Sequence, residues 1–219
     1  MMEFISTHST ILSVLAGFLV SLPLMRSKSA GTGTDSFSKL ACYCLLYSAV
    51  SVAAVVIFAA FESLIGGNGI TFGAVSTYGV YFISPLILLL LFGRNGRKRA
   101  FFDMYAFYVI PSMIIQRIRC MIKGCCYGIF IMNTQYRYPV RIAEMAFYLI
   151  MWFVLERKSR TNGTGSLFPL LMISYGAFRF INEFFRYSPS GSLFHLAHIW
   201  SAICLIIGLS LYPEFRNKQ

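Results

Sequence analysis

Charged residues are scarce in this chain. Asp, Glu, Lys and Arg make up only 12% of its 219 residues, whereas 57% are hydrophobic and the mean hydropathy is +0.67. A soluble globular domain carries about 25% charged residues, so this composition excludes that class. The sequence also lacks internal repeats and low-complexity tracts. We therefore expect residues 1–219 to form a single transmembrane domain.

Acidic residues are rarer still. Eight Asp and Glu stand against 19 Lys and Arg, which gives a net charge of +11. In a soluble protein this surplus would indicate nucleic acid, but here most cations gather in alternate segments between apolar runs, as membrane topology requires. We expect no nucleic-acid partner. These cations are Arg26, Lys28, Lys39, Arg94, Arg97, Lys98, Arg99, Arg157, Lys158, Arg160, Arg216 and Lys218.

The apolar runs predict the membrane spans, because about seven of them are long enough to cross a hydrocarbon core of ~30 Å. The first has neither a basic leading segment nor a small-residue cleavage site, which favours a retained helix over a signal peptide. If the helices alternate in direction, the cation-rich segments share the cytoplasmic side, so we predict an outer N-terminus and a cytoplasmic C-terminus. The expected fold is an all-α, polytopic integral membrane protein. The runs cover residues 9–25, 40–61, 72–92, 103–119, 141–156, 167–185 and 193–212.

One cluster of cations contradicts this sorting. Arg117, Arg119, Lys123, Arg137 and Arg141 fall on the nominally outer side. An anionic ligand would explain them, because guanidinium groups pair bidentately with phosphate in a low dielectric. The alternative is a set of side chains that snorkel to the membrane interface.

The segment 120–139 surrounds part of this cluster and differs from the rest of the chain. It mixes Gly, Cys, aromatic and basic residues without a helical period. Irregular backbone at membrane depth is tolerated where it is buried in protein or lines a wet cavity. We therefore expect an active-site loop or half-helix over 120–139 at the outer face.

A second polar feature lies inside an apolar run. Tyr175, Arg179, Glu183 and Arg186 are separated by steps of four, four and three, so a helix would place them on one face. Ionisable side chains in a membrane cost several kcal/mol unless they are partnered, and they commonly mark functional sites. An ion-pair ladder that only ties helices together is the alternative interpretation.

Cysteine and histidine are few, and neither forms a zinc motif. Cys42, Cys44 and Cys204 suit packing as small apolar residues. Three interpretations remain for Cys120, Cys125 and Cys126: small residues in a tight turn or a disulfide, a reactive thiol, or metal ligands. Because these cysteines form no C-x-x-C pair, we expect no metal. Among His8, His195 and His198, the last begins an apolar run at the outer end, where either a structural role or a base is conceivable.

Two of these segments resemble the prolipoprotein diacylglyceryl transferase family. The stretch 175–186, YGAFRFINEFFR, is similar to the family pattern Y-G-x-F-R-F-x-x-E-F-x-R. The stretch 117–128, RIRCMIKGCCYG, resembles the family signature around R-x-G-N-F-x-N-x-E-x-x-G. Arg117 and Gly128 match it, while Cys120 and Cys125 replace its Asn and Glu.

Shorter matches follow in the same order, so that the resemblance spans roughly residues 62 to 205. YPVRIAE at 138–144 is similar to the family's H/Y-P-S-Q-L-Y-E and contributes Glu144. Tyr78 stands where the family has His, and His198 where it has Gln. Asp103 lies fourteen residues before Arg117, as a family Asp does before the signature arginine.

The resemblance implies transfer of diacylglycerol from phosphatidylglycerol to a lipobox cysteine of a preprotein, with release of glycerol phosphate, in the bacterial cytoplasmic membrane and without a cofactor. It implies that arginines bind the phosphate, that Glu183 and Tyr175 orient them, the latter by a hydrogen bond, and that His198 or Tyr78 is a candidate base. The implied catalytic residues are Arg117, Arg179, Glu183, Tyr175 and His198. The implied substrate-binding residues are Tyr78, Arg119, Lys123, Cys120, Cys125, Gly128, Glu144 and Arg186.

Two departures from the family pattern leave other functions open. The link between the signature and the YP motif is too short for the family's periplasmic head region, so a transferase with another acceptor is one alternative. The second alternative is a non-catalytic protein that binds anionic lipid, because Tyr78 stands where the family has His. A transporter is disfavoured, because the sequence shows no inverted repeat and no paired broken helices.

Overall fold

The computed structural model describes residues 16–23, 37–66, 76–92, 98–131, 134–161, 166–187 and 194–216. Within these ranges the regular structure is helical, with isolated β-bridges and no extended strand. The all-α prediction is therefore confirmed. Residues 16–23 form a short helical segment. The longer helices are α2 (Phe37–Ile65), α3 (Tyr78–Phe92), α4 (Lys98–Lys123), α5 (Val140–Thr161), α6 (Leu167–Glu183) and α7 (Leu196–Arg216).

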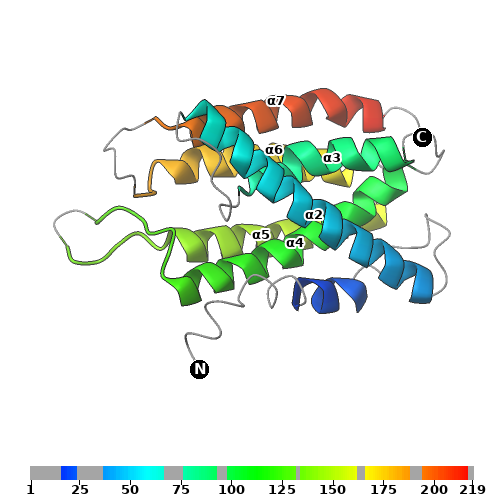
Figure 1. The fold of residues 1–219 in the computed structure, drawn as a ribbon, viewed down its shortest axis with the longest axis horizontal. Coiled ribbons are helices and arrows are strands. Elements are labelled where there is room, and N and C mark those ends of the chain that lie inside the picture. The colour runs from blue at the N-terminus through cyan, green and yellow to red at the C-terminus, as the bar shows by residue number, and fades with distance from the viewer. Residues whose placement is uncertain are drawn as a thin grey trace.

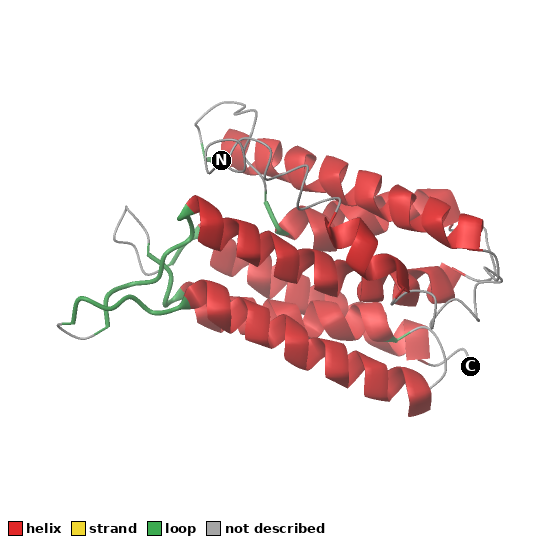
Figure 2. Cartoon of the chain, turned by 90° about the horizontal axis from the view of Figure 1, so that it is seen from below, coloured by secondary structure: helices red, strands yellow, loops and turns green. Residues whose placement is uncertain are grey.

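Consecutive helices run in opposite directions (Figure 1). The ends of α2, α4 and α6 therefore lie at the same end of the bundle as the beginnings of α3, α5 and α7. Helix α6 packs along α7, α2 along α3, and α4 along α5. Figure 2 shows the loop after α4 extending beyond this end of the bundle.

The helices differ in how well they fit a membrane span. Among the described residues, Phe37–Ile65 and Leu196–Pro213 are long and apolar enough to cross a bilayer, and α3 is apolar but shorter. Helix α4 is longer than the apolar run 103–119 that predicted it, because its charged ends are also helical. Of the first apolar run, 9–25, only 16–23 falls within the described residues.

Helix α4 lies in the middle of the bundle, and nearly every residue from Ala100 to Met113 is buried. Its beginning is joined to α6 by Asp103, whose Oδ1 accepts a hydrogen bond from the backbone N–H of Leu167 at 2.9 Å. Leu167 is the first residue of α6, and the preceding Ser166 makes no side-chain cap. Asp103 thus satisfies one of the unpaired donors at the start of that helix.

Candidate active site

Glu144 connects three helices at the end of the bundle where α4 finishes. Its carboxylate in α5 forms ion pairs with Arg117 of α4 and with Arg179 of α6. All three side chains are at least 94% buried. Arg117 also donates from Nη2 to the hydroxyl of Thr77, just before α3, at 3.3 Å. Buried charges are costly unless they are paired and hydrogen-bonded, so the shared carboxylate stabilises both arginines.

The polar stripe of α6 continues this network. Arg179 Nη2 lies 2.8 Å from Glu183 Oε2, and Arg186 Nη1 lies 3.8 Å from the same oxygen. The ion-pair ladder that the spacing allowed is therefore present. It does not stay within one helix, because Arg179 also pairs with Glu144 and Arg186 Nη2 lies 2.8 Å from Cys126 Sγ.

The turn that ends α4 explains where the cysteines lie. Gly124 adopts a φ of 61°, its N–H donates to Met121 O at 3.3 Å, and the N–H of Cys125 donates to Cys120 O at 3.1 Å. This pair of bonds is a Schellman motif, in which glycine provides the left-handed residue. Residues 120–123 thus belong to the helix, and the irregular segment begins at Gly124.

Three sulfur atoms converge at this turn. The Sγ atoms of Cys120, Cys125 and Cys126 all lie within 4.8 Å of one another, and all three thiols are free. Cys126 has a φ of 60°, which is uncommon for a residue other than glycine. A hydrogen bond from the Cys120 thiol, with the nearby charges of Arg186 and Arg117, outweighs desolvation and lowers the pKa of Cys126 below its ordinary value.

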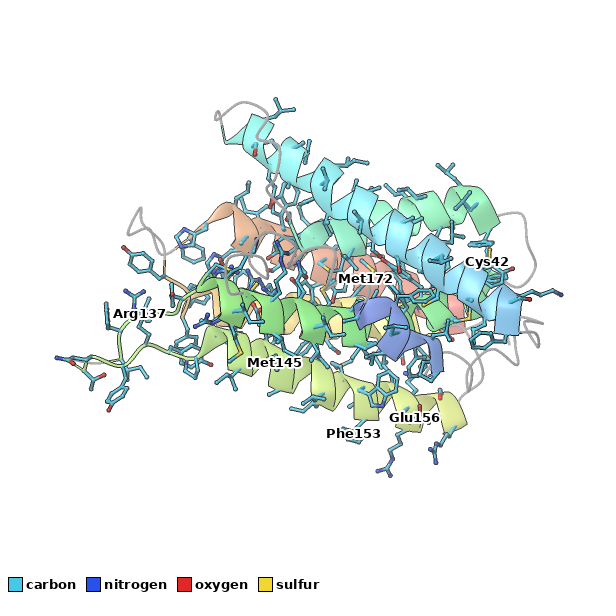
Figure 3. The ribbon with its side chains drawn as sticks, turned by 60° about the horizontal axis from the view of Figure 1, so that its bottom comes forward. Cys42, Arg137, Met145, Phe153, Glu156 and Met172 are labelled. Carbon is cyan, nitrogen blue, oxygen red and sulfur yellow. The ribbon has the colours of Figure 1, made fainter. Side chains whose placement is uncertain are left out.

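The remainder of the loop forms a narrow hairpin that is tied to the end of α6. Gly128 bridges to Arg186, and the N–H of Ile129 donates to Phe185 O at 3.0 Å. A Cβ on Gly128 would lie 2.2 Å from the carbonyl oxygen of Tyr138. Only glycine allows the two arms of the hairpin to approach so closely. Arg137, which Figure 3 shows on this projecting loop, lies over the ring of Phe130 at 4.4 Å.

A cavity of about 320 Å³ opens beside the ion-pair network. Five of its lining side chains are cationic and two are acidic. Arg179 lines it, and the Nε of Arg179 has no hydrogen-bond partner among the described residues. The cavity can therefore hold an anion. Its lining residues are Glu62, Ser76, Thr77, Tyr78, Gln116, Arg117, Arg119, Cys120, Lys123, Cys125, Cys126, Arg179, Glu183, Arg186 and Ala197.

Comparison with known proteins identifies the family of this chain. A model of the prolipoprotein diacylglyceryl transferase family matches residues 5–213. The chain belongs to this family. It is also similar to the phosphatidylglycerol–prolipoprotein diacylglyceryl transferase of Clostridium tetani (strain Massachusetts / E88), with 30% identity over 132 residues. That match covers 51% of this chain and 53% of the relative, so the chain spans about half the length of the curated relative it matches.

Most of the site residues that the family resemblance implied come together in the structure. Nine of them line the cavity, namely Arg117, Arg119, Lys123, Arg179, Glu183, Arg186, Cys120, Cys125 and Tyr78. Glu144 lies behind it and holds two of the arginines, and Gly128 shapes the neighbouring hairpin.

Tyr175 and His198 occupy different surroundings, and neither lines the cavity. The ring of Tyr175 stacks on Tyr81 at 4.1 Å, and its hydroxyl has no hydrogen-bond partner in the described part of the chain. The hydrogen bond expected from Tyr175 to an arginine is thus not formed. His198 Nδ1 accepts a hydrogen bond from the N–H of His195 at 3.1 Å, and its ring centroid lies 4.5 Å from that of Phe184.

Tyr78 faces the cavity, but its hydroxyl is already engaged. It donates to Ala197 O at 2.7 Å and lies 2.8 Å from Ser201 Oγ, both in α7. The geometry favours a positioning role over that of a free base.

Six of the residues that line the cavity were not predicted as site residues, namely Glu62, Ser76, Thr77, Gln116, Cys126 and Ala197. Glu62 lies just beyond the predicted apolar run 40–61, but α2 continues through it to Ile65, and it lines the cavity. The hydroxyl of Thr77 accepts a hydrogen bond from Arg117, and the Sγ of Cys126 contacts the guanidinium of Arg186. An acidic residue at the end of an apolar helix is a signal that would have found Glu62. No local sequence signal would have found Thr77 and Cys126, because their contacts are made with residues that are distant in sequence.

Proposed function

We propose that this protein transfers a diacylglyceryl group from phosphatidylglycerol to the lipobox cysteine of a preprotein. Membership of the family and the name of the clostridial relative support the reaction class. The observation that carries the proposal is the cationic cavity beside the buried network of Arg117, Glu144 and Arg179.

The phosphate of the lipid headgroup suits the charge of this cavity. Arginine in a low-dielectric site binds phosphate through several N–H donors at once. Glu144 fixes Arg117 and Arg179 before the lipid arrives, so little reorganisation is needed when negative charge accumulates on the leaving group. Arg179 itself lines the cavity, so its guanidinium group lies beside the space for such a ligand.

The reaction is a displacement at the glycerol carbon that carries the phosphate. The acceptor cysteine loses its proton to solvent, and its sulfur forms the new C–S bond. The C–O bond to the phosphate breaks, and glycerol phosphate leaves with the bonding electrons. A thiol with an ordinary pKa of ~8.5 needs only modest activation, and a cationic cavity supplies part of it by favouring the thiolate.

The charge distribution along the bundle supports a proposal for the orientation in the membrane. We place the protein in the bacterial cytoplasmic membrane as a multi-pass protein, with the cavity at the outer side. The other end of the helices carries Lys98, Arg157, Lys158 and Arg160, which supports a cytoplasmic position for that end.

The test is a transfer assay with purified protein in phosphatidylglycerol liposomes and a peptide that contains a lipobox cysteine. Mass spectrometry would detect the diacylglyceryl thioether on the peptide and free glycerol phosphate. Arg179→Lys removes the fork that reaches both Glu144 and Glu183, so product should fall at least about 100-fold. Arg160→Lys, in an exposed pair with Glu156, should leave it unchanged.

A transferase with a different acceptor is the second candidate. Cys120 and Cys125 at the cavity wall, where the family signature has Asn and Glu, favour it. It predicts glycerol phosphate without a modified peptide. If neither product forms although phosphatidylglycerol co-purifies with the protein, the chain is a lipid-binding protein and the transferase proposal is wrong.

A further inference from the structure

We propose that Cys120, Cys125 and Cys126 form a binding site for a thiolate-preferring divalent cation such as zinc. Their spacing in the sequence gave no reason to expect one. The folded chain nevertheless brings all three sulfur atoms together at the wall of the cavity.

The backbone creates this convergence in two steps. In a Schellman motif the residue after the left-handed position commonly contacts the residue five positions earlier. Here those residues are Cys125 and Cys120, so the motif sets two thiols against each other. The left-handed φ of Cys126 then turns a third thiol towards the same point, so that its sulfur lies within 4.8 Å of the other two.

The sulfur positions are close to those of a metal site. Two thiolates on one zinc, each at ~2.3 Å in a tetrahedral arrangement, lie about 3.8 Å apart. The three sulfurs are within 4.8 Å of one another, so closure requires shifts of about 1 Å at most. A disulfide would use only two of the three.

Charge at the site suits a soft cation bound by three thiolates. A divalent ion with three thiolates carries a net charge of −1, and the surrounding cavity has more cationic than acidic side chains. Arg186 Nη2, at 2.8 Å from Cys126 Sγ, compensates one thiolate directly. Three sulfur ligands select zinc-like ions over magnesium or calcium, which prefer oxygen.

The fourth coordination position suggests a role. The three thiols line the cavity rather than a closed core, so an exogenous ligand can complete the tetrahedron. A thiol that binds there is deprotonated by the ion and gives its proton to solvent. If the proposed transferase activity is correct, that ligand is the acceptor cysteine, and the ion replaces the missing base. This role rests on the proposed function, whereas binding of the ion does not.

The test is titration of reduced, metal-free protein in detergent with Co²⁺. One cobalt per chain should bind and produce a thiolate-to-cobalt charge-transfer band with tetrahedral visible bands, and Zn²⁺ should abolish both. Ser substitution of Cys120, Cys125 or Cys126 should weaken binding at least about tenfold. Cys42→Ser is the matched control, because Cys42 lies at the opposite end of the molecule from Arg137 (Figure 3) and should not change the spectrum. Addition of a lipobox peptide should shift the visible bands if the fourth position is open.

Two results would overturn the site. One is the absence of the charge-transfer band in protein whose six cysteines all react with a thiol reagent after denaturation. The other is a disulfide within the cluster, mapped by mass spectrometry in the protein as isolated. The transfer assay is a separate readout. A cobalt site without transfer would contradict the proposed function alone, and undiminished transfer by protein that binds no cobalt would contradict this inference alone.

Discussion

Glu144 of α5 and Arg179 of α6 form a buried ion pair between residues 35 positions apart in the chain. Arg117 of α4 shares the same carboxylate, so one acidic side chain holds two arginines from different helices. The carboxylate therefore has both a structural and an electrostatic role, because it sets the spacing of the helices and neutralises part of the positive charge at the cavity.

Replacement of Glu144 by Gln tests this dual role. Loss of one partner of a buried pair typically costs about 3–5 kcal/mol, because Arg117 would keep its charge without a carboxylate. We expect a large drop in the thermal unfolding midpoint in detergent. Glu156→Gln is the control, since its pair with the 76%-exposed Arg160 should contribute less than about 1 kcal/mol. Equal effects of the two substitutions would contradict the assignment of Glu144 as the centre of the network.

Asp103→Ala should destabilise the protein without altering the cavity. The substitution removes the acceptor for the N–H of Leu167, which should cost about 1–3 kcal/mol. Asp103 lies fourteen residues before Arg117 on one helix, or about 21 Å along its axis. Transfer per folded molecule should be unchanged, and we would measure both unfolding and product formation. Loss of transfer in a normally folded variant would assign Asp103 a direct part in the reaction.

The helices and the polar stripe were predictable, whereas the partners of the stripe were not. Apolar runs marked α2 and α7, and the steps of four and three placed Arg179, Glu183 and Arg186 on one face, because helical periodicity is a local property. That Glu144 pairs with both Arg117 and Arg179 depends on how three helices pack, and no local pattern encodes it.

The cysteines and His198 show the same limit. Gly124 at the end of a helix is a recognisable stop signal, but the left-handed conformation of Cys126 is not readable from its residue type. His198 was placed at the correct end of α7. Its ring nevertheless packs against Phe184, because orientation is decided by neighbours that are distant in sequence.

Tyr78→Phe distinguishes a positioning residue from a base. The hydroxyl is held by Ala197 O and Ser201 Oγ, so its removal should cost about 1 kcal/mol of stability. Ser201 continues to donate to Ala197 O at 2.8 Å, which leaves no acceptor unpaired. The transfer rate should stay within about threefold of the original, which corresponds to less than 1 kcal/mol in the barrier. A loss of two orders of magnitude with an unchanged unfolding midpoint would instead make Tyr78 a participant in the chemistry.

Gly128→Ala tests whether the hairpin shapes the site. An added Cβ would lie 2.2 Å from Tyr138 O, a backbone atom that cannot rotate away, so the arms of the hairpin must separate. Overpacking of this kind costs about 1–3 kcal/mol. The displacement should reach Arg186, which bridges to Gly128 and contacts Cys126, and transfer should fall together with stability. Gly124→Asn is the matched control in the same loop, because Asn accepts the left-handed conformation that this position requires. Its Cβ would lie 2.8 Å from the hydroxyl of Tyr127, which is the end of a side chain and can rotate away, unlike the backbone oxygen at Gly128. The contradicting outcome is a Gly128→Ala variant with the unfolding midpoint and transfer rate of the original protein, together with a Gly124→Asn variant in which both fall. In that case the turn rather than the hairpin determines the geometry of the site.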